Sequence, residues 1–176
     1  MEKWIDYLLR FLFYLTSKIL LLFFLVALII ISFLVAKDYM NINVLVGDGF
    51  SQRASIILKS TDASSLSRIF SQDFIENDDE LYSGKYDTFI IRSFIQDIDV
   101  DFKLVMPWSK ETIVRTKEII EKIDGELPND QRYEGMPEHL IYPPVWDNAI
   151  YDVTLDRFES TWKITRIEKV EDIKIN

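Results

Sequence analysis

The 176-residue chain contains no cysteine and a single histidine. Without thiols it can form neither disulfides nor thiolate metal sites, and it has no cysteine nucleophile. Its only histidine, His139, lies in the proline-containing stretch GMPEHLIYPP. Nothing in the sequence directs this side chain into a cavity, and a general base must lie within hydrogen-bond reach of its substrate. We therefore predict that His139 is an exposed loop residue, and we assign no catalytic residue, metal site or cofactor.

Basic residues are also scarce. The chain has 20 lysines and arginines against 29 aspartates and glutamates, a net charge of −9 at pH 7. Residues 1–18 contribute +1 and residues 19–36 carry no charge, which leaves −10 for residues 37–176. A region this acidic repels phosphate backbones and anionic head groups. We therefore exclude nucleic acid as a partner and expect cationic proteins or neutral ligands.

The longest uncharged run is residues 19–36, ILLLFFLVALIIISFLVA. As a helix it extends about 27 Å, close to the hydrocarbon thickness of a bilayer. We predict an uncleaved anchor that acts as a tether, because the run has no charge and no Gly-x-x-x-Gly pattern. A cleaved signal peptide is the alternative, but its apolar core is shorter, and cleavage after Ala36 would put Leu34 where a small residue is required. The residues assigned to the anchor are Ile19, Leu22, Phe24, Leu28, Ile31 and Ala36.

Basic residues flank this run unevenly. Lys3, Arg10 and Lys18 precede it, whereas only Lys37 and Arg53 lie in an equally long stretch after it. Cytoplasmic flanks of membrane helices hold the excess of lysine and arginine. We therefore predict a cell-membrane protein with a cytoplasmic N-terminus and its C-terminal region outside the cytoplasm. The reverse orientation is the alternative.

The distribution of apolar and polar residues divides the chain into a membrane anchor at residues 1–37, a short polar connector at 38–43 and a folded domain at 44–176. Two helices are predicted at the start of the domain, at 44–59 and 61–79, because apolar residues recur there at helical intervals. The apolar face of the first consists of Val46, Phe50, Ala54, Ile57 and Leu58, and that of the second of Leu66, Ile69, Phe70, Phe74 and Ile75.

From residue 94 to residue 106 the period changes to two, which predicts a strand with one buried and one exposed face. Residues 111–124 are compatible with a strand or a helix. We favour a strand, because half of the positions are β-branched and a turn precedes them. A second hairpin follows, with its turn near Glu159 and Ser160. The alternating apolar residues of the first strand are Ile98, Val100, Phe102, Leu104 and Met106.

Two phrases, SSLSRIFSQDF before the strands and STWKITRIEKV at the end, resemble the nuclear transport factor 2-like superfamily. The resemblance covers residues 44–170. It implies an α+β fold in which the N-terminal transmembrane helix is followed by amphipathic helices packed on a curved antiparallel sheet of about four strands. In this superfamily the curved sheet wraps the helices into a cone.

Membrane-anchored members of this superfamily occur in bacterial conjugation and type IV secretion machines and among envelope proteins connected with sporulation. Because a complete anchor is joined to a well-patterned core that lacks a convergent catalytic set, we expect a non-enzymatic, single-pass membrane protein that presents an extracytoplasmic protein-interaction or assembly module of this kind. The alternative that it implies is a small-ligand-binding protein, or a lyase or isomerase, that uses the cavity of the cone. A fold alone does not decide between these functions. The sequence leaves open whether the interior of the cone is open or packed. We predict that Phe70 and Phe74 contact residues such as Phe102, Leu104 and Trp162.

Two sets of residues are candidates for a partner surface. Asp97, Asp99 and Asp101 share one face of the first predicted strand. Their spacing of about 6.7 Å is too wide for one small cation to bind all three, so they form either a solvated face or an acidic stripe that binds a basic protein. Tyr142 and Trp146 lie in a proline-rich loop. They form either a rigid contact surface or, as we favour, a cover over the open end of the core.

Overall fold

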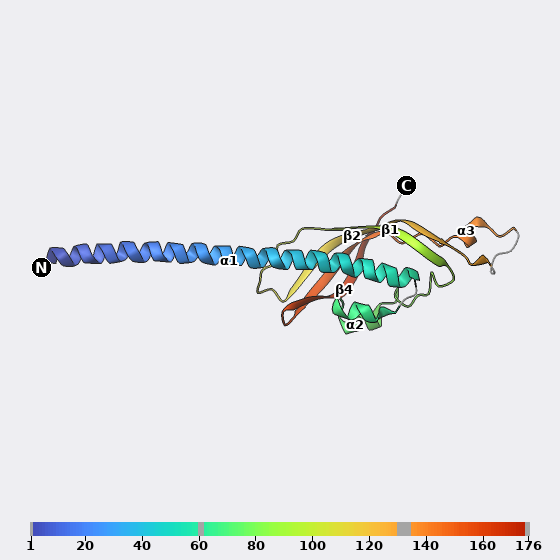
Figure 1. Cartoon of the computed structure of the whole chain (residues 1–176), viewed down its shortest axis with the longest axis horizontal. Coiled ribbons are helices and arrows are strands. Elements are labelled where there is room, and N and C mark those ends of the chain that lie inside the picture. The colour runs from blue at the N-terminus through green and yellow to red at the C-terminus, as the bar shows by residue number, and fades with distance from the viewer. Residues whose placement is uncertain (1, 60–61, 130–134, 175–176) are drawn as a thin grey trace.

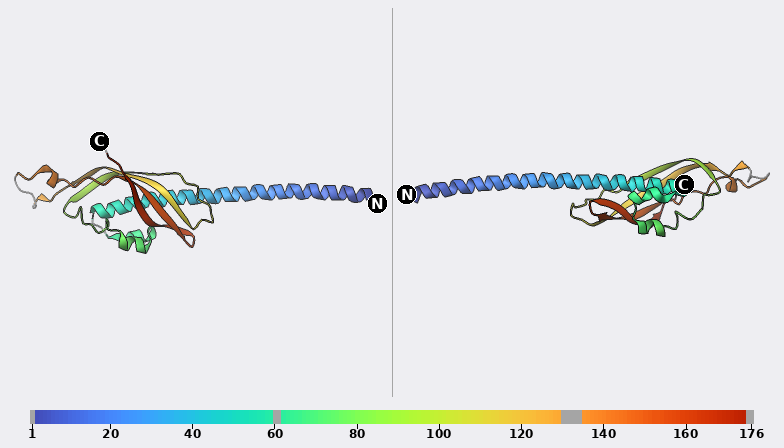
Figure 2. Two further views of the ribbon diagram at one scale, coloured as in Figure 1. Left: turned by 180° about the vertical axis from the view of Figure 1, so that it is seen from behind. Right: turned by 60° about the horizontal axis from the view of Figure 1, so that its bottom comes forward.

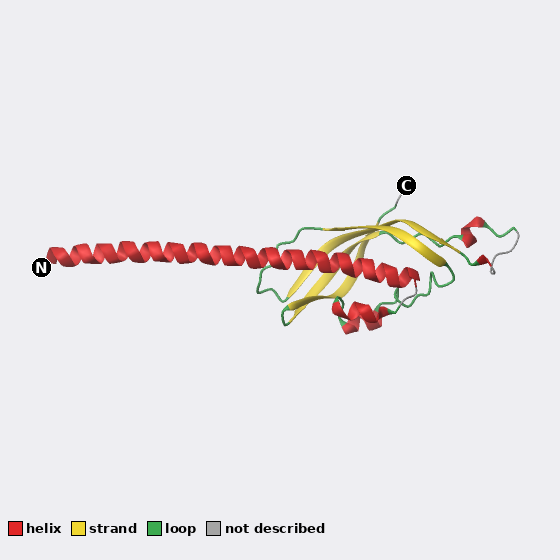
Figure 3. Ribbon diagram, viewed as in Figure 1, coloured by secondary structure: helices red, strands yellow, loops and turns green. Residues whose placement is uncertain are grey.

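The computed structural model describes residues 2–59, 62–129 and 135–174. Over these residues the protein is α+β, with one long apolar N-terminal helix and a four-stranded antiparallel sheet (Figure 1 and Figure 3). The helices are α1 (Glu2–Lys59), the 3-10 helix η1 (Ala63–Arg68), α2 (Gln72–Asn77) and α3 (Glu138–Ile141). The strands are β1 (Ile90–Val100), β2 (Glu111–Glu126), β3 (Ala149–Phe158) and β4 (Thr161–Asp172).

α1 is one continuous helix of 58 residues, about 87 Å long at 1.5 Å per residue. The polar stretch 38–43, predicted as a connector, is helical, and the first helix of the domain does not begin separately at residue 44. Contacts with the domain account for this difference. Asp38 accepts a 2.6 Å hydrogen bond from Arg157 Nη2, and the ring centroids of Tyr39 and Phe102 lie 4.9 Å apart. Tertiary packing thus supports helix where the local sequence favours it only weakly.

The C-terminal part of α1 is a core element. All five residues predicted for its apolar face are buried. Gly49 on this face marks a close approach to the rest of the domain, because a Cβ added there would lie 2.9 Å from Ile164 Cδ1 and 3.0 Å from Ile69 Cγ2. A Cβ added at Gly47 would meet no described atom within 4 Å. Gly49 therefore lets the helix pack tightly, at some cost in helix propensity.

The second predicted helix is two short helices, η1 and α2. Between them the backbone of Ile69 and Ser71 pairs with Ile164 on β4, through Ile164 N to Ile69 O and Ser71 N to Ile164 O, both 2.9 Å. This isolated bridge interrupts the helix. Asp62 caps η1 by accepting a hydrogen bond from the backbone of Ser64, and Ser71 caps α2 in the same way.

The sheet has the strand order β1-β2-β3-β4, with every neighbouring pair antiparallel. The predicted four-stranded antiparallel sheet is confirmed, and so is the choice of a strand for residues 111–124. The predicted turn of the second hairpin is also confirmed: Phe158 pairs with Thr161, and Glu159 has a positive φ of 57°. Strands that are neighbours in the sheet are also consecutive strands in the chain, with α3 in the connection between β2 and β3.

β1 ends at Val100, so the prediction of a strand up to residue 106 is wrong. Its pairing with β2 finishes at Val100 and Thr116, and a last hydrogen bond runs from Asp101 N to Arg115 O at 2.8 Å. The alternation of apolar and charged residues continues beyond this point, but a strand also requires a hydrogen-bonded neighbour. Beyond it, Phe102, Leu104 and Met106 are exposed by 70%, 56% and 37%.

The core lies between the C-terminal part of α1 and one face of the sheet, while the N-terminal part of α1 extends away from the domain (Figure 2). Phe70 and Trp162 share this core, and Phe74 packs against it with its ring 4.9 Å from that of Phe70. The predicted contacts of Phe70 and Phe74 with Phe102 and Leu104 are wrong, because those two side chains lie on the surface. A second group of buried side chains, which includes Ala54, Leu58, Tyr86, Ile120 and Trp146, lies nearer the C-terminus of α1.

Candidate functional site: a buried carboxyl and the pocket beside it

A buried glutamate lies between α1 and the sheet. Side chains of β2 are alternately buried and exposed, and Glu118 takes a buried position with an exposure of 1%. Its Oε1 accepts a 2.7 Å hydrogen bond from Gln96 Nε2 on β1, and its Oε2 accepts a 3.2 Å bond from Trp146 Nε1. Burial raises the pKa of Glu118 to about 7, against the opposing effects of the Arg53 charge and of these two hydrogen bonds. Glu118 therefore changes its charge near neutral pH.

An ionic cluster, which we call the Arg53 cluster, consists of the buried side chains of Arg53 and Asp78 and the exposed side chain of Glu80. Arg53 is on α1 and 5% exposed. Its Nε and Nη2 donate to the two carboxylate oxygens of Asp78 at 2.6 and 3.0 Å, and Nη2 also donates to Glu80 Oε2 at 2.6 Å. Burial alone would lower the pKa of Arg53, but the hydrogen bonds and charges of Asp78 and Glu80 outweigh it and raise that pKa above its ordinary value. The cluster fastens the chain after α2 to α1.

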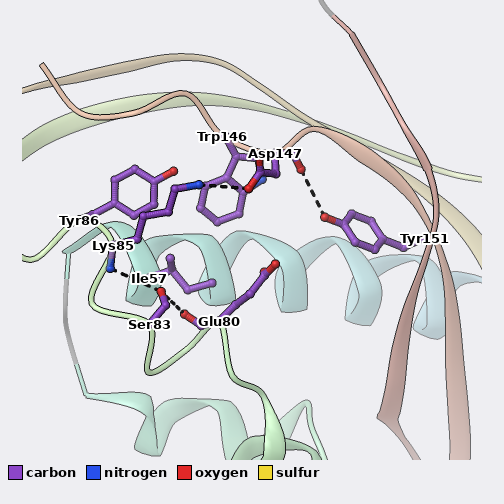
Figure 4. Close-up of a pocket in the computed structure, with 8 residues that line it drawn as sticks. All are labelled: Ile57, Glu80, Ser83, Lys85, Tyr86, Trp146, Asp147 and Tyr151. Carbon is purple, nitrogen blue, oxygen red and sulfur yellow. Dashed lines mark hydrogen bonds and ion pairs between the residues drawn. The ribbon is translucent and has the colours of Figure 1, made fainter. Parts of the chain in front are cut away.

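Glu80 also lines a small pocket near the C-terminal end of α1 (Figure 4). The cavity has a volume of about 110 Å³. Inside it, Lys85 Nζ forms a 3.1 Å ion pair with Asp147, and the ring of Tyr86 stacks on Trp146 with centroids 6.1 Å apart. The lining residues are Ile57, Glu80, Ser83, Lys85, Tyr86, Trp146, Asp147 and Tyr151.

The pocket is too small for most metabolites, since ligand pockets usually measure about 300–1,000 Å³. Burial, followed by nearby acidic charges, raises the pKa of both Tyr86 and Tyr151, so their hydroxyls stay protonated. Trp146 lines the pocket and donates to Glu118, whereas Glu118 is not among the lining residues. The arrangement therefore holds the carboxyl behind an indole ring, outside direct reach of a molecule in the pocket.

The hydrogen bonds around Glu118 join several elements of the fold. Gln96 Nε2 contacts Glu118 and, at 3.4 Å, the carbonyl oxygen of Phe50 on α1. Asn148 accepts a 2.6 Å bond from the backbone of Ile120 on β2. These bonds join α1, β1, β2 and the segment before β3 in a polar layer within the core. Among the residues that the structure describes, no group of three or more His, Cys, Asp or Glu side chains could hold a metal ion.

Of the predicted partner-surface residues, four are exposed and one is buried. Asp97, Asp99 and Asp101 are exposed, and Tyr142 is 52% exposed. Trp146 is 7% exposed and belongs to the core, so assigning it to a partner surface was wrong; it covers the core as the favoured interpretation has it. Its indole N–H and ring are both engaged inside the protein, which leaves the aspartates and Tyr142 as surface candidates.

The remaining predicted residues concern the anchor and the histidine. The anchor residues from Ile19 to Ala36 are exposed, except that Ala27 and Val35 are partly covered. α1 is long and apolar enough to cross a membrane, and other described parts of the chain bury none of its most apolar stretch. The side chain of His139 lies outside the described residues, so its predicted exposure stays a prediction.

Sequence reasoning missed Arg53 and Glu118. Arg53 lies three residues after Phe50 and four before Ile57, so it falls on the predicted apolar face of α1. Glu118 lies two residues before Ile120, a buried position of β2. A charged residue inside an apolar face was the available signal in both cases.

No family model, curated protein or solved structure matches the chain. What the chain itself shows is an apolar helix long enough to cross a membrane, whose C-terminal part belongs to the core of a small α+β domain.

Glu118 should make the protein less stable as the pH rises. A carboxyl whose pKa is raised by folding stabilises the fold fully below its unfolded pKa of 4.5, and that contribution is lost as the pH rises through about 7. The difference corresponds to about 3 kcal/mol in the free energy of unfolding. Denaturant unfolding of the full chain in detergent micelles across this pH window should show the loss in the wild type and a much weaker one in Glu118→Gln. Glu121→Gln, at an exposed position of β2, is the control; a Glu118→Gln profile parallel to the wild type would contradict the assignment.

Proposed function

We propose that this protein is a single-pass membrane protein whose α1 helix holds a nuclear transport factor 2-like domain at the outer surface of the cell membrane, as a protein-interaction or assembly module. The observation that carries the proposal is the continuity of α1. Its N-terminal part is apolar and uncovered, and residues from Ile42 onward contribute to the core of the domain. One helix is thus both anchor and core element.

The order of elements supports the family assignment. Helical segments precede the four antiparallel strands, with α3 between β2 and β3. The C-terminal part of α1 and α2 contact the sheet, and η1 is joined to β4 by the hydrogen bond from Lys163 Nζ to Ser67 O. We propose that these helices are amphipathic and that the sheet curves around them, as in the cone of that superfamily. The assembly that such a module would join is an envelope machine of the conjugation, secretion or sporulation type.

A continuous helix suits an assembly role because it fixes the domain relative to the bilayer. A flexible linker would let the domain rotate and search a large volume. Here Asp38 and Tyr39, the second and third residues after the apolar run, already contact the domain. A partner would therefore meet the module at a defined height and orientation.

The basic residues support the outward orientation. Lys3, Arg10 and Lys18 precede the apolar run, whereas Lys37 and Arg53 are the basic residues in an equally long stretch after it. Cytoplasmic flanks of membrane helices hold the excess of lysine and arginine. This bias favours a cytoplasmic N-terminus and an outward-facing domain.

Orientation can be tested with a membrane-impermeant maleimide, because the chain has no cysteine of its own. Tyr82→Cys lies on the domain at a site that is 63% exposed, and Trp4→Cys lies at the other end of α1. In intact cells we expect labelling of Tyr82→Cys, with labelling of Trp4→Cys only after permeabilisation. The opposite pattern would reverse the orientation, and labelling of both in intact cells would contradict a single span.

The partner surface that we propose is the exposed acidic face at Asp97 and Asp99, with Tyr142. Its test is crosslinking in the native membrane followed by recovery of the protein. Asp97→Asn with Asp99→Asn should reduce the recovered partner, while Glu168→Gln with Glu171→Gln, at exposed positions of β4, should not. Unchanged recovery with the first pair would remove these aspartates from the proposed surface.

A second candidate is a small-ligand-binding protein or a lyase or isomerase. It is favoured by Glu118, whose pKa of about 7 suits proton transfer, next to a pocket with the Lys85–Asp147 ion pair. It requires the pocket of about 110 Å³ to enlarge and Trp146 to move aside. Binding of a small molecule that is lost in Tyr86→Ala and changes the Trp146 fluorescence would support this candidate.

A further inference from the structure

We infer that the loop between β1 and β2, residues 101–110, inserts its apolar side chains into the head-group region of the bilayer that α1 crosses, so that the domain binds its own membrane at a second point. We call these residues the membrane loop. The inference rests on the proposed function in one respect, that α1 spans a bilayer. It adds a lipid-binding site that the anchor alone does not require.

The membrane loop exposes a concentration of apolar surface. Phe102 and Trp108 are each 70% exposed, Leu104 is 56% exposed and Met106 is 37% exposed. Clusters of exposed apolar residues on a folded domain mark surfaces that bind proteins or membranes. Tryptophan and phenylalanine next to lysine are typical of segments that lie in the membrane interface.

The position of the membrane loop selects the membrane as its partner. It lies at the end of the domain that faces the N-terminal part of α1 (Figure 1). Phe102 contacts Tyr39, and Arg157 donates both to Asp38 and to the carbonyl oxygen of Pro107. Asp38 and Tyr39 are the second and third residues after the apolar run, about 3 to 5 Å along the helix axis. The head-group region extends about 5 to 7 Å beyond the hydrocarbon on each side, so the loop lies within its depth.

The loop is held in this conformation by the domain. Val105 points inward and is only 3% exposed. The backbone N–H of Arg157 donates to Lys110 O at 2.7 Å, and Lys103 Nζ donates to Ile113 O at 2.6 Å. A turn is closed by Ser109 N and Met106 O at 2.9 Å. The apolar side chains therefore face outward from a fixed backbone, as a preorganised binding surface requires.

Charge is compatible with this location. The domain as a whole is acidic, but residues 101–110 contain two lysines and one aspartate, and Lys37 lies where α1 leaves the apolar run. Lysine near the bilayer surface is attracted to lipid phosphates. The membrane loop is thus a segment of the domain that anionic head groups do not repel.

The test is depth-dependent quenching of a fluorophore on the full chain. Single-cysteine variants Leu104→Cys and Trp108→Cys would carry an NBD label in vesicles of phosphatidylcholine and phosphatidylglycerol, with nitroxide quenchers at the head group or deep in the acyl chain. Leu25→Cys, in the apolar run, controls for the anchor. Tyr82→Cys controls for the distal domain, because Glu80 nearby binds Arg53, seventeen residues or about 25 Å beyond Ala36.

We expect the labels at 104 and 108 to lose fluorescence to the shallow quencher, the label at 25 to the deep quencher, and the label at 82 to neither. Labels at 104 and 108 that behave like the label at 82, with the label at 25 still quenched, would overturn the membrane loop and leave the anchor standing. An unquenched label at 25 would instead overturn the span, and with it the proposed function. If the label at 104 is protected from the lipid quenchers only at high protein concentration, and this protection disappears on dilution, the surface binds a second copy of the chain. That result would overturn lipid binding.

A variant tests whether the apolar side chains cause the insertion. In Phe102→Ser with Trp108→Ser, the label at 104 should lose its shallow quenching while the protein stays membrane-bound through α1. Val145→Ser, at a site that is 84% exposed in the loop before β3, should leave the quenching at 104 unchanged. Equal quenching in both backgrounds would contradict the role of these side chains.

Discussion

Replacing Arg53 by methionine should lower the free energy of unfolding by about 3–5 kcal/mol, the range found when one partner of a buried ion pair is removed. Methionine fills most of the same volume but leaves the Asp78 carboxylate, whose side chain is 7% exposed, without its guanidinium. The segment that this bond fastens to α1 would then open. Denaturant unfolding of the full chain in micelles, followed by tryptophan fluorescence, measures the change.

Two variants separate this effect from a general loss of charge. Arg115→Ala removes an exposed ion pair with Asp152 and should leave the unfolding midpoint nearly unchanged, since exposed pairs contribute little. Arg53→Met combined with Asp78→Asn should recover part of the lost stability, because the unpaired buried charge is then neutral. If Arg53→Met shifts the midpoint no more than Arg115→Ala does, the Arg53 cluster does not hold the domain together.

Replacing Gly49 by leucine should destabilise the protein by about 3 kcal/mol, at the upper end of the usual cost of overpacking. The new side chain would start 2.9 Å from Ile164 Cδ1 and 3.0 Å from Ile69 Cγ2, inside the core. α1 would have to move away from β4, which would also disturb the backbone bridge between Ile164 and the residues around Phe70. The same unfolding measurement applies.

Gly47→Leu is the matched control, two residues earlier on the same helix. Its added Cβ would meet no described atom within 4 Å, so the gain in helix propensity should dominate and stabilise the protein by about 0.5–1 kcal/mol. The two substitutions are chemically identical and should have opposite signs. Equal effects would mean that α1 does not pack against β4 in this register.

The sheet was predictable because its signal lies within each strand. Apolar and polar residues alternate along the strand, and the burial of β2 and β3 alternates in the same way, with one face covered. The break between η1 and α2 was not predictable, because it is made by Ile164, far along the chain. The continuity of α1 depends in the same way on Arg157, 119 residues from Asp38.

In the membrane loop, the prediction of a strand up to residue 106 is wrong. Their alternation with polar residues predicts that Phe102, Leu104 and Met106 lie on the buried face of a strand, whereas all three are exposed. An alternating pattern does not specify whether an apolar side chain is covered by the rest of the domain or by a lipid surface. Arg53 and Glu118 show the converse case, in which a charged residue on an apolar face indicates a buried polar partner.

The central claim is that one unbroken helix crosses the bilayer and becomes the core helix of the domain. A spin-label scan of single-cysteine variants through residues 30–50, in vesicles, measures accessibility to oxygen and to a water-soluble nickel chelate at each position. We predict a single helical period of about 3.6 residues through 38–43, a change from oxygen to nickel access near Lys37, and low access to both reagents at Ile42, Val46 and Phe50, which are buried. Uniformly high nickel access across 38–43, without that period, would contradict the claim.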